Sequence, residues 1–291
     1  MKLSIFELKL RTDKLYELLE SCTLCPRNCR VNRFGSKDGA CRTGVKPIVS
    51  SFGPHFGEES FLVGFGGSGT IFFTNCNLSC VFCQNWTISQ MHEGEEIEVK
   101  DLASIMLKLQ RMNCHNINLV SPTHQVPMIV EALIYAFESG LRIPIVYNCG
   151  GYESVQTLKL LEGIVDIYMP DFKYGDDEKA LKYSKITNYT TIAKRSLEEM
   201  FRQVGPLKIE HGIATRGVFV RHLVMPNDVS SSERVLELIA SVSVEIPVNI
   251  MAQYYPAFKA YNYPEINKRV THDELDRALK KARELGLKIV S

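Results

Sequence analysis

The sequence predicts an α/β protein built from parallel βαβ units, preceded by a small loop-rich N-terminal lobe that contains cysteines. Two observations support this prediction. From Gly69 onward, short apolar runs alternate with longer stretches of helical periodicity, and the stretch from Cys22 to about Phe65 is irregular and rich in Gly, Pro, Ser and Cys. Strands that alternate with helices are typical of a parallel sheet, either wound or closed into an incomplete β/α barrel.

The individual elements follow from the spacing of the apolar residues. Residues Lys2 to Leu19 carry them at roughly helical spacing and predict an opening amphipathic helix. The predicted strands are apolar runs at Gly69–Thr74, Ile117–Val120, Ile143–Tyr147, Ile164–Met169, Val218–Met225 and Val248–Met251. The helices after them are expected at Lys100–Met112, Val126–Ser139, Ser154–Glu162, Asp177–Lys185, Thr190–Val204, Ser231–Ser241 and Asp273–Leu287. We therefore divide the chain into an N-terminal helix and cysteine-rich lobe, residues 1–65, and a partial barrel, residues 66–291.

Composition and charge narrow the classes of function. The chain has 291 residues, of which 45% are apolar and 23% charged, and its net charge is +1. This balance argues against binding to nucleic acid or to a membrane surface by bulk electrostatics. The first twenty residues mix charged and apolar side chains and lack the apolar core of a signal peptide, and no later stretch resembles a membrane span. We therefore expect a cytoplasmic protein.

Nine cysteines are present, and seven of them lie in two groups between Cys22 and Cys83. Because disulfides are rare in a reducing cytoplasm, clustered thiols are interpreted first as metal ligands or catalytic groups. The other two, Cys114 and Cys149, are isolated in the sequence and are expected to be small buried apolar residues.

The second group, here called the cysteine triplet, follows the first predicted strand directly and consists of Cys76, Cys80 and Cys83 with the spacing C-x3-C-x2-C. A closed zinc site or a four-iron cluster used for electron transfer needs four protein ligands. Three thiolates leave one iron open, where a substrate or cofactor can bind. The alternative is a zinc site with a distant fourth ligand, for which His92 is the nearest candidate.

The cysteine triplet, with Phe82 directly before its last member, resembles the cluster-binding motif of the radical S-adenosylmethionine (SAM) superfamily. From about Cys22 to Tyr255, the chain is similar to pyruvate formate-lyase-activating enzymes, especially those with an added N-terminal cysteine segment. The resemblance implies an incomplete (β/α)6 radical SAM barrel and an oxidoreductase with a [4Fe-4S] cluster and SAM as cofactors. In that family, the reduced cluster splits SAM into methionine and a 5′-deoxyadenosyl radical, and Phe82 would shield the cluster from water.

The resemblance extends to the ends of the second and third predicted strands. Activating enzymes have a Gly-Gly-Glu turn that holds the SAM amino group, where this chain has Ser-Pro-Thr-His at residues 121–124. Thr123 and backbone carbonyls would take that contact here. The third strand ends in Asn148-Cys-Gly-Gly, similar to the family's Thr-Asn-Gly end, which implies that Asn148 contacts the cofactor.

Charged residues match the family at the next two strand ends. Asp171 and Lys173 are similar to the Asp-x-Lys sequence near SAM in activating enzymes, and Arg221 matches a family arginine near the cofactor. Two residues that lie two apart at a strand end share one face, so they could bind an ion, the cofactor carboxylate or its ribose. From the residues alone, the alternatives are that Asp171 and Lys173 form a surface ion pair and that Arg221 is a structural ion-pair partner.

The first group, here called the N-terminal cysteine set, has the spacing C-x2-C-x3-C-x11-C and consists of Cys22, Cys25, Cys29 and Cys41. Four thiols are the right number for a closed tetrahedral site. Zinc and a second [4Fe-4S] cluster both fit this set, and a segment without metal is the alternative. A loop-rich segment of some forty residues rarely holds together by apolar burial alone, so a bound metal is a natural cross-link.

The resemblance also implies partners. An electron donor such as flavodoxin or ferredoxin would reduce the cluster, and an activating enzyme would abstract hydrogen from a backbone glycine of a glycyl-radical partner protein. The radical could instead modify a small molecule or a peptide side chain. Two hypotheses of other classes are a non-catalytic iron–sulfur electron carrier and a zinc-binding interaction module. An open iron argues against the carrier, which would gain nothing from it.

Overall fold

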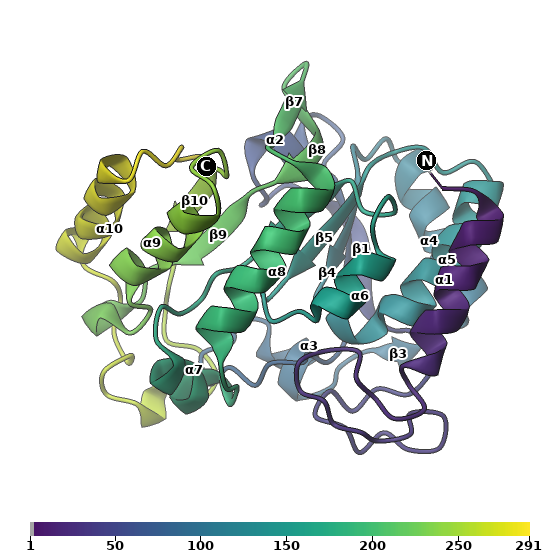
Figure 1. Cartoon of the computed structure of the whole chain (residues 1–291), viewed down its shortest axis with the longest axis horizontal. Helices are drawn as coiled ribbons and strands as arrows, with labels where there is room; N and C mark the ends of the chain where they lie inside the picture. The colour runs from purple at the N-terminus through teal and green to yellow at the C-terminus, as the bar shows by residue number, and fades with distance from the viewer. Residues whose placement is uncertain (1–2) are drawn as a thin grey trace.

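The computed structural model describes residues 3–291 and contains a large mixed sheet flanked by helices (Figure 1). Its strand order is β3-β1-β2-β4-β5-β6-β8-β7, and β9 and β10 form a second, two-stranded sheet. The strands are β1 (Ile48–His55), β2 (Ser68–Phe73), β3 (Glu95–Glu96), β4 (Ile117–Val120), β5 (Ile145–Cys149), β6 (Ile167–Pro170), β7 (Lys208–Glu210), β8 (Ile213–Val218), β9 (Val220–Leu223) and β10 (Val248–Met251).

The helices alternate with these strands along most of the chain. They are α1 (Ile5–Glu17), α2 (Ser60–Val63), α3 (Trp86–Gln90), α4 (Val99–Arg111), α5 (Val126–Glu138), α6 (Val155–Leu160), α7 (Asp177–Ser184), α8 (Tyr189–Val204), α9 (Ser232–Val242) and α10 (His272–Glu284). Three short 3-10 helices are η1 (Thr123–Gln125), η2 (Pro226–Asp228) and η3 (Ala260–Asn262). The predicted start of the first helix, Lys2, lies outside the described residues.

The predicted parallel sheet is confirmed. Strands β2, β4, β5, β6 and β8 are parallel neighbours in that order, and β9 pairs in parallel with β10. The predicted strand Val218–Met225 is divided, because the chain leaves the large sheet at the buried residue Phe219 and continues as β9. An isolated bridge between Asp171 and Arg221 keeps β9 beside the end of β6. The result is an α/β fold whose barrel is not closed.

One strand of the large sheet lies within the stretch that the sequence predicts to be irregular. β1 pairs antiparallel with β2 from Val49–Phe73 to His55–Ser68. It contains Ser, Gly and Pro, and only its first residues are buried, so it lacks the apolar run of the inner strands. The sheet therefore extends across the predicted boundary at residue 65.

The helices pack against one another around the sheet. α1 begins with a capping box, in which the Ser4 hydroxyl accepts a hydrogen bond from the Glu7 amide and the Glu7 carboxylate accepts one from the Ser4 amide. α1 packs against α5, α5 against α4, α6 against α8, and α8 against α9. Figure 1 shows α6 and α8 in front of β4 and β5. All residues of β4 and β6 are buried, as expected for inner parallel strands.

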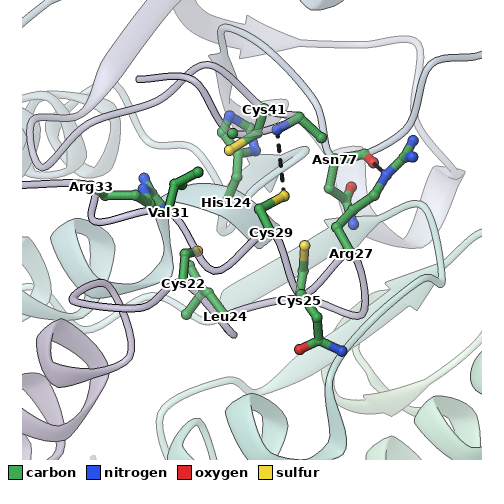
Figure 2. Close-up of a pocket in the computed structure, with 13 residues that line it drawn as sticks. Cys22, Leu24, Cys25, Arg27, Cys29, Val31, Arg33, Cys41, Asn77 and His124 are labelled. Atoms are coloured by element: carbon green, nitrogen blue, oxygen red, sulfur yellow. Dashed lines mark hydrogen bonds between the residues drawn. The ribbon is translucent and has the colours of Figure 1, made fainter. Parts of the chain in front are cut away.

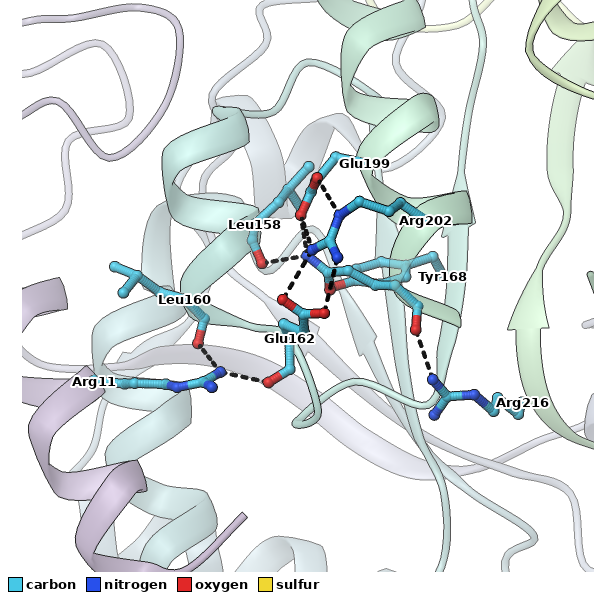
Figure 3. Close-up of polar contacts among 9 residues, drawn as sticks. Arg11, Leu158, Leu160, Glu162, Tyr168, Glu199, Arg202 and Arg216 are labelled. Atoms are coloured by element: carbon cyan, nitrogen blue, oxygen red, sulfur yellow. Dashed lines mark hydrogen bonds and ion pairs between the residues drawn. The ribbon is translucent and has the colours of Figure 1, made fainter. Parts of the chain in front are cut away.

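Polar contacts on the outer side join three helical segments (Figure 3). Arg202 on α8 donates to both carboxylate oxygens of Glu162, at 3.0 and 2.8 Å, and to Glu199 one turn before it. Arg11 on α1 donates to the carbonyl oxygens of Leu160, at 3.2 Å, and of Glu162. These contacts link α1 and α8 to the turn after α6, which leads to the amino end of β6.

Gly151 provides a test of how closely two strand ends approach. It follows β5 with φ of +76°, and a Cβ there would lie 2.2 Å from the carbonyl oxygen of Asp171. Gly140 is the control: it also has a positive φ, +97°, but a Cβ built on it would have no atom within 4 Å. Replacement by Ala should cost about 1–2 kcal/mol at either site because of backbone strain. Gly151→Ala should cost roughly 1–3 kcal/mol more because of the clash. Urea unfolding measures both, and equal losses would contradict the close approach.

Candidate active site at the carboxyl ends of the strands

A cavity of about 640 Å³ lies at the carboxyl ends of the strands. Small-molecule sites typically occupy roughly 300–1,000 Å³, and α/β folds place them at this edge of the sheet. The parallel strands other than β8 each place a residue on the cavity wall. Three of these residues directly follow or closely follow a strand: Cys76 after β2, Ser121 after β4 and Asp171 after β6. Three lie within a strand: Asn148 in β5, Arg221 in β9 and Asn249 in β10. The strand order thus brings residues distant in sequence into one site.

All three thiols of the cysteine triplet line this cavity. Each sulfur has a polar neighbour: Cys76 Sγ accepts from the Leu78 amide at 3.3 Å, Cys80 Sγ lies 2.9 Å from Ser184 Oγ, and Cys83 Sγ lies 3.2 Å from Ser89 Oγ. Hydrogen bonds to cluster-bound sulfur tune the potential of an iron–sulfur centre. The two serines were not predicted from the sequence, because they belong to α7 and α3 and meet the thiols only in the folded chain.

The triplet loop, residues 74–85, is irregular and is held by buried hydrogen bonds. The Thr74 carbonyl accepts from Nε2 of His124 at 2.8 Å and from Nε2 of Gln125 at 3.1 Å. Asn77 Nδ2 donates to the Tyr152 carbonyl at 2.9 Å. The loop is therefore fastened to the connections that follow β4 and β5, which places its thiols at the carboxyl edge of the sheet.

Burial governs the protonation of two thiols of the triplet, those of Cys76 and Cys80. It raises the pKa of the Cys76 thiol to about 12 and that of Cys80 to about 11, while the nearby Lys173 ammonium acts in the opposite direction on both. Both thiols are therefore protonated at neutral pH in the metal-free chain. Because a metal binds the thiolate, binding of iron would release these protons.

Asp171 and Lys173 form an ion pair inside the cavity, with side chains 27% and 20% exposed. Burial acts to lower the pKa of Lys173, but Asp171 and the other neighbouring groups raise it above its ordinary value, so the ammonium form persists. The hydroxyl of Tyr189 accepts a hydrogen bond from the Lys173 amide at 2.7 Å and lies 3.2 Å from the Asp171 carbonyl oxygen. The pair is thus not a contact of the open surface, and its position is set by the buried tyrosine.

Arg221 also lines the cavity, but it is engaged by two carboxylates that the sequence did not single out. Its Nε donates to Glu59 at 2.8 Å, its Nη2 donates to Glu59 at 2.5 Å, and it forms an ion pair with Glu58. Asn249 Nδ2 donates to Glu59 at 2.8 Å. Glu58 and Glu59 lie in an irregular segment about 160 residues from Arg221, so no local pattern could have indicated this cluster.

The remaining predicted residues occupy different surroundings. Asn148 lines the cavity, and Phe82 lines it while packing edge-on against Tyr174 and Tyr254. Thr123 is buried, and its hydroxyl donates to Glu153 at 2.7 Å; Ser121 is the residue of that turn that faces the cavity.

His92, the alternative zinc ligand, has Nδ1 at 2.5 Å from Asn75 Oδ1 and Nε2 at 2.6 Å from Arg42 Nη1. Both ring nitrogens are thus engaged by other side chains. Cys114 and Cys149 are both buried, as predicted for isolated cysteines. Within residues 3–291, no three His, Cys, Asp or Glu side chains are already gathered around the position of a single metal ion. In the same part of the chain, no helix is long and apolar enough to cross a membrane.

Comparison with known families identifies the family to which the chain belongs. The family model described as the radical SAM superfamily matches residues 70–239, which include the cysteine triplet and the ends of β2 to β9. The chain belongs to the radical SAM superfamily. Membership in this superfamily supports cleavage of SAM at an iron–sulfur cluster, which also requires a reductant.

Relatives of this radical SAM chain include the uncharacterized protein MJ0674 of Methanocaldococcus jannaschii. The two are 35% identical over 300 residues, and the match covers all of this chain and 82% of the relative. Among solved structures, methylornithine synthase (PylB) matches 99% of this chain and 75% of its own, with 13% identity and a TM-score of 0.51. A radical SAM methyltransferase from Sphaerobacter thermophilus matches 76% of this chain and 65% of its own, with 15% identity and a TM-score of 0.48. The likeness to PylB shows the fold.

The residues present fit the cofactors that radical SAM chemistry requires. Three thiols with the superfamily spacing share a cavity of about 640 Å³ with a carboxylate, an ammonium group and the Asn148 amide. These groups are complementary to a zwitterionic amino acid and a ribose, which are the polar parts of SAM. The electron-carrier hypothesis does not account for a cavity of this size beside the thiols.

Arg221 should be essential for stability, because it neutralises two buried carboxylates. Removing one partner of a buried ion pair typically costs roughly 3–5 kcal/mol. We expect a loss of this size for Arg221→Ala at neutral pH, measured by urea unfolding. Arg234→Ala, which removes an exposed pair with Glu237, should cost less than about 1 kcal/mol.

The loss in free energy of unfolding expected for Arg221→Ala should depend on pH. Burial alone would raise the pKa of Glu59, but hydrogen bonds from Arg221 lower it below its ordinary value. The stabilisation is therefore fully present above the unfolded-state pKa and is lost as pH falls through the folded-state pKa. The difference in free energy of unfolding between the wild type and Arg221→Ala should therefore become smaller in acid. A difference that does not change with pH would show that the carboxylates do not depend on Arg221.

Proposed function

We propose that this chain is a radical SAM enzyme that cleaves SAM reductively at a [4Fe-4S] cluster bound by the cysteine triplet. The observation that supports this most directly is that three thiols with the superfamily spacing line the same cavity as the ends of six strands. With cluster and SAM bound, one-electron reduction of the sulfonium supplies methionine and a 5′-deoxyadenosyl radical. The protein's own contribution is to bind, orient and exclude water.

Lys173, Asp171 and Asn148 are proposed to hold SAM. The Lys173 ammonium, which stays charged, suits a carboxylate, and the Asp171 carboxylate suits an amino group or ribose hydroxyls. Tyr189 sets the position of the Lys173 backbone, so the pair stays at the cavity wall. Phe82, buried between Tyr174 and Tyr254, would exclude water from the thiols beside it.

For the fate of the radical, we propose the activating-enzyme type, in which hydrogen is taken from a backbone glycine of a partner protein. The resemblance of the sequence to activating enzymes supports this. The cavity also has exposed lining residues at Gln84, Asn85 and Gln253, so it opens to solvent and could admit a segment of another chain. A small molecule or a peptide could enter through the same opening. The alternative to the activating-enzyme type is therefore that the radical modifies such a substrate.

The central test is SAM cleavage by the reconstituted protein. After anaerobic loading with iron and sulfide, then dithionite and SAM, the chain should form 5′-deoxyadenosine and methionine slowly even without a partner. The variant in which Cys76, Cys80 and Cys83 are replaced by Ala should form neither, because it lacks the cluster ligands. Cys114→Ala, at a buried cysteine outside the cavity, serves as the control and should keep the activity. Chromatography of the reaction measures both products.

The outcomes separate the hypotheses. If an intact reduced cluster yields no 5′-deoxyadenosine, the electron-carrier hypothesis is favoured over this one. If a glycyl-radical protein labelled with deuterium at glycine transfers that deuterium to the 5′-methyl group of the product, the activating-enzyme type is supported. Cleavage of SAM without such transfer, but with transfer from a small molecule or peptide, would support the alternative substrate.

Lys173→Ala should weaken SAM binding. A hydrogen bond to a charged group contributes roughly 1.5–3 kcal/mol, which corresponds to a loss of about ten-fold or more in affinity. Lys182→Ala is the matched control, because Lys182 forms its ion pair with Glu265 at the surface, where its side chain is 53% exposed. Calorimetric titration of SAM into each cluster-loaded protein gives the comparison. Unchanged affinity in both Lys173→Ala and Asp171→Ala would remove this pair from the SAM site.

A further inference from the structure

The sulfur of Cys80 lies at the end of a buried row of hydroxyl groups. Its Sγ lies 2.9 Å from Ser184 Oγ, and Ser184 Oγ lies 2.7 Å from the hydroxyl oxygen of Tyr174. Ser184 and Tyr174 are both 0% exposed, and Cys80 is 7% exposed, so water does not compete for these two contacts. By contrast, Cys83 Sγ lies 3.2 Å from Oγ of Ser89, which is only half-buried. Among the triplet sulfurs, that of Cys80 therefore has the more fully enclosed hydroxyl partner.

The direction of both hydrogen bonds follows from the partners that are available. When Cys80 binds iron as a thiolate, its sulfur carries no proton and can only accept, so the Ser184 hydroxyl must donate to it. Within residues 3–291, the Tyr174 hydroxyl has Ser184 as its one hydrogen-bond partner. Because an unpaired buried O–H is costly, Tyr174 donates to Ser184 Oγ. Each hydroxyl in the row then donates toward the sulfur, and aligned hydrogen bonds of this kind strengthen one another.

Main-chain contacts hold Ser184 opposite Cys80. The amides on both sides of Cys80, those of Ser79 and Val81, donate to the carbonyl oxygens of Ser184 and Tyr183 at 3.1 and 2.8 Å. Ser184 is the last residue of α7, so the end of this helix lies against the triplet loop. The distance between Ser184 Oγ and Cys80 Sγ is therefore set by the backbone on both sides and does not depend on a flexible side chain.

The N-terminal cysteine set adds a contact from another side. Its four thiols line a small cavity of about 10 Å³, and Figure 2 shows their sulfurs with Arg27 and Asn77 beside them. Arg27 donates to the carbonyl oxygens of Asn77, at 2.8 Å, and of Lys185, and its Nη2 lies 3.5 Å from the carbonyl oxygen of Ser184. One guanidinium group thus joins the triplet loop to the end of α7.

We propose that Ser184, oriented by Tyr174, raises the reduction potential of the cluster at the triplet by donating a hydrogen bond to the Cys80 sulfur. This inference rests on the proposed function, because it requires iron at the triplet. Both residues are positioning residues, since they act through Cys80. A donor to cluster-bound sulfur stabilises the more negative, reduced state. One electron is taken up from the reductant, and the hydroxyl proton stays on Ser184.

Redox titration of the full chain, loaded anaerobically with iron and sulfide, tests this inference. Electron paramagnetic resonance measures the reduced cluster, and the signal that is absent from the variant with Ala at all three triplet positions belongs to the triplet. In Ser184→Ala, the ratio of reduced to oxidised cluster at a fixed potential should fall about three- to ten-fold, a part of the roughly ten-fold or more that a hydrogen bond to a charged group contributes. Ten-fold corresponds to about 59 mV for one electron. Tyr174→Phe should lower the ratio by a smaller factor, because Ser184 can still donate.

Two matched variants control for changes in packing. Tyr254→Phe removes a hydroxyl that donates to the Ile266 carbonyl at 2.8 Å. The ring of Tyr254, like that of Tyr174, packs edge-on against Phe82. Ser196→Ala removes the hydroxyl of a buried serine that donates to carbonyl oxygens. Neither variant should change the potential. Looser packing that admits water to the sulfur would raise the potential, because water stabilises the more negative state, so the sign of the shift separates this effect from loss of the hydrogen bond.

An unchanged or raised potential in Ser184→Ala would overturn the proposal. If Ser184→Ala does not fold or does not bind the cluster, Tyr174→Phe, which keeps the aromatic ring, decides the question by the same criterion. A lower potential in Ser184→Ala without any change in Tyr174→Phe would overturn the part assigned to Tyr174. A wild type that binds no cluster at the triplet would instead overturn the proposed function, so the two failures are distinguishable.

Discussion

The candidate site depends on the buried hydrogen bonds that hold the triplet loop at the edge of the sheet. This loop is irregular, so its backbone groups find partners outside it. His124 and Gln125 bind the Thr74 carbonyl, and the Ser79 and Val81 amides donate to the carbonyls of Ser184 and Tyr183 at 3.1 and 2.8 Å. Because an unpaired buried backbone group is costly, these partners restrict the loop to one path. The loop that carries the three thiols is thus positioned by residues of η1 and α7.

The charges of the cavity form two groups with different roles. Lys173 and Asp171 lie near the thiols and remain partly exposed, so a ligand can compete for them at modest cost. Arg221 and Glu59, with side chains 15% and 1% exposed, bind each other more completely. A buried ion pair of this kind is expensive to desolvate and is destabilising to break, which suits a structural role. The Lys173–Asp171 pair is thus available to a ligand, whereas the Arg221–Glu59 pair stays bound to itself.

The N-terminal cysteine segment borders the triplet loop. Arg27 ties the N-terminal segment to the Asn77 carbonyl, and Asn77 in turn binds the Tyr152 carbonyl after β5. The N-terminal segment also receives a hydrogen bond from Thr157 of α6 on the Leu24 carbonyl, at 2.7 Å. Loss of order in the N-terminal segment would therefore be transmitted to the triplet loop through Asn77. This gives the segment a physical connection to the candidate active site.

The sequence by itself determined the features that depend on local pattern. Apolar runs predicted the inner parallel strands, because a strand buried on both faces needs such a run, and the spacing of the triplet indicated the cluster motif. Only the tertiary structure decided which side chains share the cavity. Glu58 and Glu59 reach Arg221 across some 160 residues, and Ser184 reaches Cys80 across 104. It also showed Thr123 turned toward Glu153, and β1 added to the sheet without a strong apolar run. Such contacts follow from strand order and packing, which short-range periodicity does not encode.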